Sequence, residues 1–161
     1  MEWSSLYVMQ KQLDDYIETH HQLVNEDLFE KKYLALLTEL GELANETRCF
    51  KFWSTKPRNK QSVILEEYVD GIHFILSLGM EKGYRSAPDP VNAAAPDESG
   101  QFIRVYDTCA NFYHHPSEQL YKELLGQYVK LGELLGFDEQ AVIDAYREKN
   151  EINYERQDQG Y

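Results

Sequence analysis

The sequence predicts an all-α fold, and three observations support this prediction. Apolar residues recur at helical spacing along most of the 161 residues. No run of residues alternates convincingly between apolar and polar positions, as a half-exposed strand would. Glycine, proline and capping residues divide the periodic stretches into about six segments. We therefore expect a single domain, residues 1–161, built as a bundle of about six helices.

Each expected helix has its own start or stop signal. Gly83 ends the third helix and Gly136 the fifth, while Asp138 is a good N-cap for the sixth. Pro57 and several basic residues indicate a loop between the second and third helices. The stretch 84–100 contains three prolines and a terminal glycine, so we expect a mobile loop there. The expected helices cover residues 4–21, 25–46, 61–82, 101–114, 116–135 and 138–153.

The third expected helix differs from the others because apolar residues surround nearly its whole circumference. Such a helix lies at the centre of a fold or at a subunit interface. In a chain this short we expect both, so that a core four-helix arrangement is completed in a homodimer.

Composition limits the classes of function. The formal net charge of −12 argues against binding to nucleic acid, which requires a basic face, but permits a small polyphosphate if divalent cations intervene. Cys49 and Cys109 are expected to be reduced thiols in a cytoplasmic protein. The start of the chain lacks a signal-peptide pattern, and no apolar segment is long enough for a bilayer, so no membrane contact is expected.

Carboxylates occupy unusual positions on two of the expected helices. Glu39, Glu42 and Glu46 share an arc of about 60° that borders the apolar face of the second helix. Glu67 and Asp70 lie within an apolar stripe of the third helix, which carries no lysine or arginine before Lys82. Ionised carboxylates in such places need compensation.

Divalent cations are one form of compensation, and oxygen ligands from facing helices suit Mg²⁺. A solvated acidic face or ordinary salt bridges are the alternative, because glutamate pairs are common on helices. A di-iron site is less consistent with the sequence, because such bundles use two Glu-x-x-His motifs. Here only Glu18-x-x-His21 is complete, and Asp70-x-x-His73 has aspartate in place of glutamate.

The spacing of the acids resembles a known signature. Glu39-x-x-Glu42, then 24 residues, then Glu67-x-x-Asp70 is similar to the ExxE…ExxD pattern of the all-α NTP pyrophosphatase superfamily, which includes MazG-like enzymes and dimeric dUTPases. Three further segments resemble the dimeric dUTPase branch: residues 6–13 with Gln10, the aromatic run 50–54 with Trp53, and the C-terminal residues 149–161. The Asp70-Gly-Ile-His73 segment also matches that branch, whereas Asp14 stands about where it has an asparagine.

This resemblance implies hydrolysis of dUTP, and often dUDP, to dUMP by a homodimer with Mg²⁺. Glu39, Glu42, Glu67 and Asp70 are then expected to hold about two or three Mg²⁺ ions, with Glu39 also accepting a proton from the attacking water. Base and sugar contacts are expected from Gln10, Trp53, His73, Asn150 and Asn153. Phosphate contacts are expected from Lys56, Lys149, Arg156 and Tyr161.

Two other functions remain open at this point. One is a MazG-like pyrophosphatase that uses another nucleoside triphosphate. The other is a helical module whose nucleotide site controls binding to a regulatory protein partner.

Overall fold

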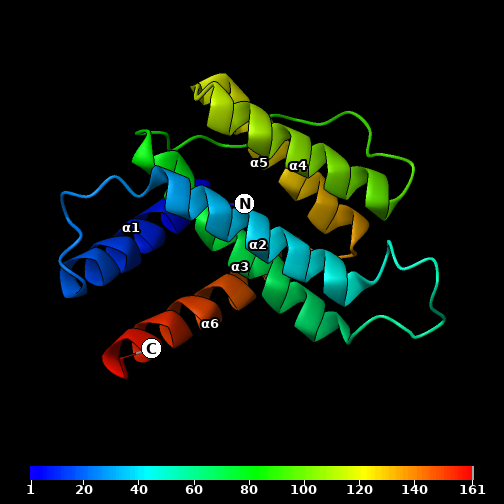
Figure 1. Ribbon diagram of the computed structural model, residues 1–161, viewed down its shortest axis with the longest axis horizontal. Coiled ribbons are helices and arrows are strands. Elements are labelled where there is room, and N and C mark those ends of the chain that lie inside the picture. Colours follow the sequence, from blue (N-terminus) through cyan, green and yellow to red (C-terminus); the bar gives the residue numbers. More distant parts are fainter. Residues whose placement is uncertain (161) are drawn as a thin grey trace.

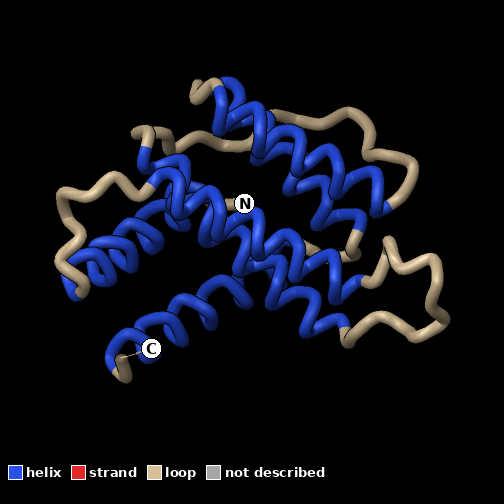
Figure 2. The backbone as a smooth tube through the Cα atoms, viewed as in Figure 1, coloured by secondary structure: helices blue, strands red, loops and turns tan. Residues whose placement is uncertain are grey.

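Six helices account for 70% of the chain in the computed structural model, which describes residues 1–160. The described residues contain no strand, so the predicted all-α fold is confirmed (Figure 2). The helices are α1 (Trp3–His20), α2 (Phe29–Thr47), α3 (Gln61–Glu81), α4 (Glu98–His114), α5 (Glu118–Leu134) and α6 (Glu139–Asp158).

Three boundaries differ from the expected ones. The second helix begins at Phe29, whose amide donates to the Asp27 carboxylate at 3.0 Å, rather than at residue 25. The fourth helix begins three residues earlier than expected, because the Asp97 side chain caps it by accepting from the Gly100 amide at 2.7 Å. The sixth continues to Asp158, so it carries residues 149–158 of the C-terminal polar segment on one regular element.

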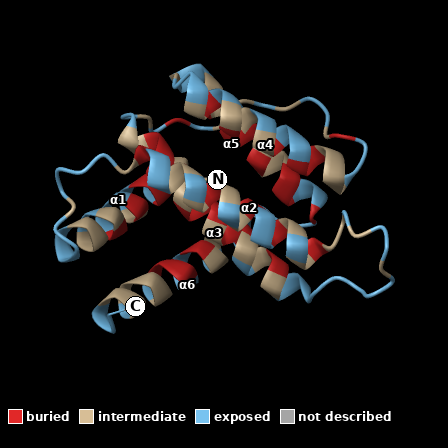
Figure 3. Cartoon of the chain, in the orientation of Figure 1, coloured by how far each residue is buried: buried red, intermediate tan, exposed pale blue. Residues whose placement is uncertain are grey.

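Helix α3 is the centre of the structure. It packs against α1, α2, α5 and α6, while α4 packs mainly against α5 and also against α2. Figure 1 shows α2 and α3 side by side, the α4–α5 pair on one side of them, and α1 and α6 on the other. Buried residues occur on every face of α3, whereas the other helices have one buried face and one exposed face (Figure 3). The predicted central position of this helix is therefore confirmed; completion of the bundle in a homodimer stays a prediction.

Glycines allow α3 and α5 to approach closely through tyrosine rings. Tyr68 of α3 and Tyr128 of α5 stack at 4.7 Å between ring centroids, and each hydroxyl donates to the other residue's carbonyl, at 3.1 and 2.6 Å. A Cβ on Gly71 would lie 2.0 Å from the Tyr128 hydroxyl, and one on Gly132 would lie 2.3 Å from that of Tyr68. Neither glycine leaves room for a side chain, so this contact fixes how α3 and α5 pack.

The loop between α3 and α4 is attached to the helices at several points. The Tyr7 hydroxyl donates to the Ser86 carbonyl at 2.7 Å, and the Asp89 amide donates to the Lys122 carbonyl at 3.1 Å. The Ala95 amide donates to the Gln101 side chain at 3.0 Å. The mobility predicted for this loop stays a prediction. Among residues 1–160, no helix combines the length and apolar character needed to cross a bilayer.

Candidate functional site

Three carboxylates converge where α2 and α3 lie side by side. One oxygen each from Glu39, Glu67 and Asp70 lies within 4.8 Å of the others, and all three residues are half-buried. Glu42, one turn along α2 from Glu39, is exposed at the rim of this group. The helical spacing that predicted a shared face thus brings three of the four acids into one cluster.

The cluster is electrostatically strained. Burial, with Asp70 and Glu42 as like-charged neighbours, raises the pKa of Glu39 to about 8. Burial, with Asp70 and Glu42 again adding to it, raises the pKa of Glu67 to about 7. No residue in the described part of the chain hydrogen-bonds to the buried Oε2 atoms of Glu39 and Glu67. Clustered oxygen ligands with unpartnered buried atoms fit a hard divalent cation.

A lysine compensates part of this cluster, as the salt-bridge alternative from the sequence allows. Lys149 of α6 places its Nζ 3.2 Å from Asp70 Oδ1 and 2.9 Å from Glu66 Oε1. Burial favours a lower pKa for Lys149, but the two carboxylates outweigh it and the pKa is raised. The pattern within α3 could not reveal this partner, which comes from a helix far along the chain. The cluster therefore contains one lysine, which pairs with Asp70. Its other two carboxylates, Glu39 and Glu67, form no ion pair with a lysine in the described chain.

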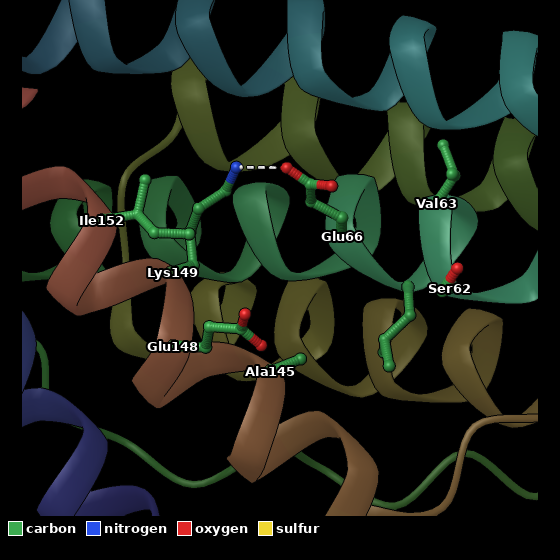
Figure 4. A pocket seen from close by; sticks show the side chains of 8 residues that line it. Ser62, Val63, Glu66, Ala145, Glu148, Lys149 and Ile152 are labelled. Atoms are coloured by element: carbon green, nitrogen blue, oxygen red, sulfur yellow. Dashed lines mark hydrogen bonds and ion pairs between the residues drawn. The ribbon is translucent and has the colours of Figure 1, made fainter.

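Lys149 also borders a groove between α3 and α6. The groove has a volume of about 300 Å³ and is mainly apolar, with the Lys149–Glu66 ion pair at its edge (Figure 4). Its lining residues are Ser62, Val63, Leu65, Glu66, Ala145, Glu148, Lys149 and Ile152.

A second cleft, of about 300 Å³, runs from the acid cluster to the polar side chains of α1. Glu39 and Asp70 lie on its wall together with Gln10, His73 and Asn153. The full lining is Gln10, Leu13, Asp14, Ile17, Glu39, Asp70, His73, Phe74, Ser77, Asn153, Arg156 and Gln157. Polar groups at one end and carboxylates at the other suit an elongated ligand with a hydrogen-bonding ring and an anionic tail.

Gln10 is the centre of a buried hydrogen-bond network in this cleft. Its Oε1 lies 2.6 Å from His73 Nδ1 and accepts from the Tyr146 hydroxyl at 2.8 Å, while its Nε2 donates to Asp14 Oδ1 at 2.9 Å. The His73 ring stacks on Tyr146, with 4.1 Å between centroids. Burial, with Lys149 nearby, lowers the pKa of His73 to about 3, so the imidazole is neutral. Its Nε2 is buried, and residues 1–160 offer it no hydrogen bond.

Helix α6 lines the other side of the cleft. Asn153 and Arg156 are on the wall, and the Arg156 cation is close enough to Asp70 to oppose the rise in that carboxyl's pKa. Asn150 is buried, and its Oδ1 has no hydrogen-bond partner within the described chain. Gln10, His73, Asn153 and Arg156, which the sequence singled out separately, thus share one cavity with Glu39 and Asp70.

A comparison with known families agrees with this geometry. The family model described as dUTPase matches residues 2–161. The chain belongs to the dUTPase family. Membership implies a nucleotide pyrophosphohydrolase, and the family generally uses a divalent metal, as the acid cluster suggests. No curated protein matches the chain.

Some residues that resemble the dUTPase pattern lie away from the cleft. Trp53 is 65% exposed in the loop after α2, and neither it nor Lys56 lines the cleft. Figure 1 shows this loop at the opposite end of α2 from α1 and α6. Glu46 accepts a hydrogen bond from Asn59 at 2.7 Å instead of joining the cluster. Tyr161 lies outside the described residues.

The structure adds residues that sequence reasoning missed. Tyr146 was assigned no role, although it stacks on His73 and donates to Gln10. Asp14 was noted only as a departure, although its position four residues after Gln10 places both on one helix face. The di-iron alternative loses support, because the acid cluster contains no histidine among the described residues and Glu18 lies 3.9 Å from Lys32.

Proposed function

We propose that the protein hydrolyses dUTP, and also dUDP, to dUMP in the cytoplasm with Mg²⁺ as its metal. The observation that carries this proposal is the cleft itself. A buried oxygen of Glu39 without a partner stands at one end, and hydrogen-bonding side chains that include Gln10, His73 and Asp14 stand at the other. A uridine nucleotide offers the matching halves, an uncharged base and a chain of phosphates.

Glu39, Glu67 and Asp70, with Glu42 at the rim, are suited to hold about two or three Mg²⁺ ions. Bound there, the ions supply positive charge for the phosphates and make water more acidic. Nearby cations would return the raised pKa values of Glu39 and Glu67 towards the ordinary range, so both residues would be ionised ligands. Glu39, which lies between the cluster and the cleft, is positioned to take a proton from the attacking water.

Helix α6 provides the cations for the phosphates. Lys149 is already held beside Asp70, and Arg156 lines the cleft near the same carboxylate. Arginine suits paired phosphate oxygens, and lysine acts as a mobile point charge. Binding of the phosphates would therefore draw Lys149 from Glu66 and Asp70 towards the nucleotide.

The opposite end of the cleft provides contacts for the base and sugar. Gln10 retains one free amide hydrogen, and His73 presents a bare Nε2. Asn153 lines the cleft beside them, and Asn150 has an unsatisfied oxygen that a sugar hydroxyl would satisfy. A site built from such groups rejects a base that leaves them unpaired.

We further propose that the active form is a homodimer in which the loop after α2 completes the partner's site. Trp53 and Phe52 are exposed by 65% and 92%, an unfavourable state for large apolar rings, although Trp53 makes edge contacts with Phe52 and Phe50 in the same loop. Lys56 lies in the same loop, in an open basic depression with Arg48, Lys51 and Arg58. Trp53 of the partner subunit would then stack on the base, and Lys56 of the partner subunit would approach the phosphates.

The test is a panel of dNTPs and dUDP, each incubated with Mg²⁺ or with EDTA while nucleoside monophosphate release is measured. We expect turnover of dUTP and dUDP that EDTA abolishes. Glu67→Gln should reduce turnover more than about 100-fold, since it removes a metal ligand, whereas Glu151→Gln on the exposed face of α6 should not change it. Preference for another dNTP, or turnover in EDTA, would refute the proposal.

A further inference from the structure

Asp14 controls a chain of hydrogen bonds that reaches into the base pocket. The chain runs from Asp14 Oδ1 through the Gln10 amide to His73 Nδ1, over distances of 2.9 and 2.6 Å. The other oxygen of Asp14 accepts from the Ser77 hydroxyl at 2.7 Å. The inference below rests on the proposed function, since it concerns how the same pocket selects a base.

Two of the three partners of Gln10 tolerate either orientation of its amide. The Tyr146 hydroxyl can donate to Gln10 or accept from it, because the Leu6 carbonyl at 3.4 Å offers the hydroxyl a second acceptor. Neutral His73 can likewise carry its proton on either ring nitrogen. An ionised Asp14 has no such choice, because a carboxylate only accepts.

In the hydrogen bonds of Asp14 both carboxylate oxygens act as acceptors, from Gln10 and from Ser77. Burial raises the pKa of Asp14, and Lys32 and these two hydrogen bonds reduce the rise without cancelling it. The Lys32 ammonium lies 4.0 Å from Oδ2 and also pairs with Glu81 at 2.6 Å and Glu18 at 3.9 Å. The Asp14 carboxylate thus lies between one cation, Lys32, and two hydrogen-bond donors. Its Oδ1 faces the Gln10 amide as an acceptor.

We propose that Asp14 is the positioning residue that fixes the base-reading pattern of this pocket. Its carboxylate holds Gln10 with Nε2 towards α1 and Oε1 towards His73, and Gln10 in turn holds His73 with the proton on Nδ1 and a bare Nε2. A base bound in this pocket would therefore meet a donor, the second amide hydrogen of Gln10, and an acceptor, the buried Nε2 of His73, once it displaces the atoms that cover this nitrogen.

This pattern has a consequence for the choice between uracil and cytosine. Uracil has a hydrogen donor at N3 and an acceptor at O4, whereas cytosine has an acceptor at N3 and a donor at N4. Once the sugar fixes the position of the ring, a given donor–acceptor pair fits only one of these edges. If the Gln10 amide turned over and the His73 proton moved to Nε2, the donor and the acceptor of the pocket would change places. The pocket would then favour cytosine over uracil.

The first test measures the His73 tautomer in the unsubstituted, ligand-free protein by ¹⁵N NMR, which separates protonated from bare ring nitrogens. We expect the proton on Nδ1. The same measurement on Asp14→Ala, in which Gln10 loses the acceptor that fixes its amide, should show a mixture of tautomers. A proton on Nε2 in the unsubstituted protein, or an unchanged tautomer in Asp14→Ala, would overturn the proposal. The first of these results does not depend on whether the variant folds.

The second test measures the ratio of kcat/KM for dUTP to that for dCTP. Asp14→Ala should lower this ratio about tenfold, the worth of one hydrogen bond, whereas a purely structural role would reduce both values together. The matched control is Asp15→Ala, which removes the same group from the next, exposed residue, whose ion pair in the described chain is with Lys11. An unchanged ratio contradicts the role of Asp14 in selecting the base. Absence of dUTP turnover in the unsubstituted protein contradicts the proposed function instead. In that case the NMR measurement still tests whether Asp14 fixes the His73 tautomer.

Discussion

The acids of the site differ in how much water and how many cations surround them. Asp70 has the Lys149 ammonium at 3.2 Å, whereas Glu39 and Glu67 each have a buried oxygen with no partner in the described chain. Burial and neighbouring carboxylates raise the pKa of Glu39 to about 8 and that of Glu67 to about 7, whereas at Asp70 the Lys149 ammonium reduces the rise that burial causes. Without a cation, these two carboxyl groups lower the stability of the folded protein whenever they ionise.

Because the pKa values of these two carboxyl groups are raised in the folded protein, its free energy of unfolding should depend on pH and on bound metal. The ordinary pKa of both groups is 4.5, so between about pH 5 and 8 the folded protein binds more protons than the unfolded chain. The free energy of unfolding of the metal-free protein should therefore fall as the pH rises towards 8. Mg²⁺ would restore it, so the metal-induced rise in Tm should be larger at about pH 8 than at about pH 6.5.

Thermal unfolding at these two pH values, with and without Mg²⁺, provides the measurement. The lower limit avoids His73, whose pKa of about 3 in the folded protein produces a separate loss of stability below its ordinary value of 6.5. Glu39→Gln should reduce the fall in Tm between the two pH values, and Glu151→Gln should not. Equal falls in Glu39→Gln and the unsubstituted protein would exclude Glu39 as the source.

Sequence reasoning could identify single residues of the site but not their partners. The spacing of Glu39, Glu67 and Asp70 was sufficient, because two packed helices bring matching faces together. Lys149 was assigned to phosphate alone, because nothing in the pattern of α3 indicates that α6 returns to it. A long-range contact of this kind depends on how the helices pack, which a single sequence does not encode locally.

Among the elements, α3 is the one whose sequence and position agree most directly. Its apolar circumference predicted a central helix, and it packs against four of the other five helices. Its glycines were less informative from sequence. Gly71 lies mid-helix, where glycine is unfavourable, and only the structure reveals that the Tyr128 hydroxyl occupies the space a side chain would need.

Substituting Gly71 tests this packing. In Gly71→Ala the new Cβ would lie 2.0 Å from the Tyr128 hydroxyl and 2.8 Å from the ring carbon that carries it, so α3 and α5 must separate. We expect a loss of about 3 kcal/mol in the free energy of unfolding, measured by urea denaturation. Gly41→Ala is the control, because its Cβ would meet only the Tyr106 hydroxyl at 3.6 Å, and the higher helix propensity of alanine should stabilise it by about 0.5–1 kcal/mol. A similar small gain in both variants would contradict the proposed packing.

Helix ends were predicted less well than helix identities, for local reasons. Gly100 was taken as part of a loop, but its amide is the donor that the Asp97 cap requires, so α4 begins before it. Residues 25–28 were taken as helical, but the Asp27 carboxylate accepts from the Phe29 amide and places the start of α2 there. In both places one hydrogen bond from the backbone to an aspartate side chain, which competes with the periodic pattern, lies at the boundary.

At the scale of the whole molecule, the cleft and the aromatic loop lie apart within one chain. The cleft contains groups suited to a base and to metal ions, while Trp53 and Lys56 lie in the loop that follows α2 and do not line the cleft. A homodimer that brings the loop of one subunit to the cleft of the other would unite them. It would also cover exposed rings that a monomer leaves in water.

Mixing two damaged chains distinguishes this arrangement from a site within one subunit. Glu67→Gln removes a metal ligand and Trp53→Ala removes the stacking ring, so each homodimer should be impaired. In a mixed dimer, the cleft of the Trp53→Ala chain keeps Glu67 and receives Trp53 of the partner subunit. An equal mixture should form mixed dimers in half of all cases and so recover about a quarter of full activity.

The matched control replaces Trp53→Ala by Gln10→Ala. Gln10 and Glu67 belong to the same subunit's site, because Gln10 lines the cleft beside Glu39 and Asp70, which share the cluster with Glu67. No mixed dimer of Glu67→Gln and Gln10→Ala contains an intact site, so this mixture should show no recovery. Recovery in both mixtures would indicate simple stabilisation by mixing, and recovery in neither, or a monomer in sedimentation, would exclude a shared site. Recovery only with Trp53→Ala requires that the aromatic loop acts across the dimer, because no arrangement within one subunit produces that difference.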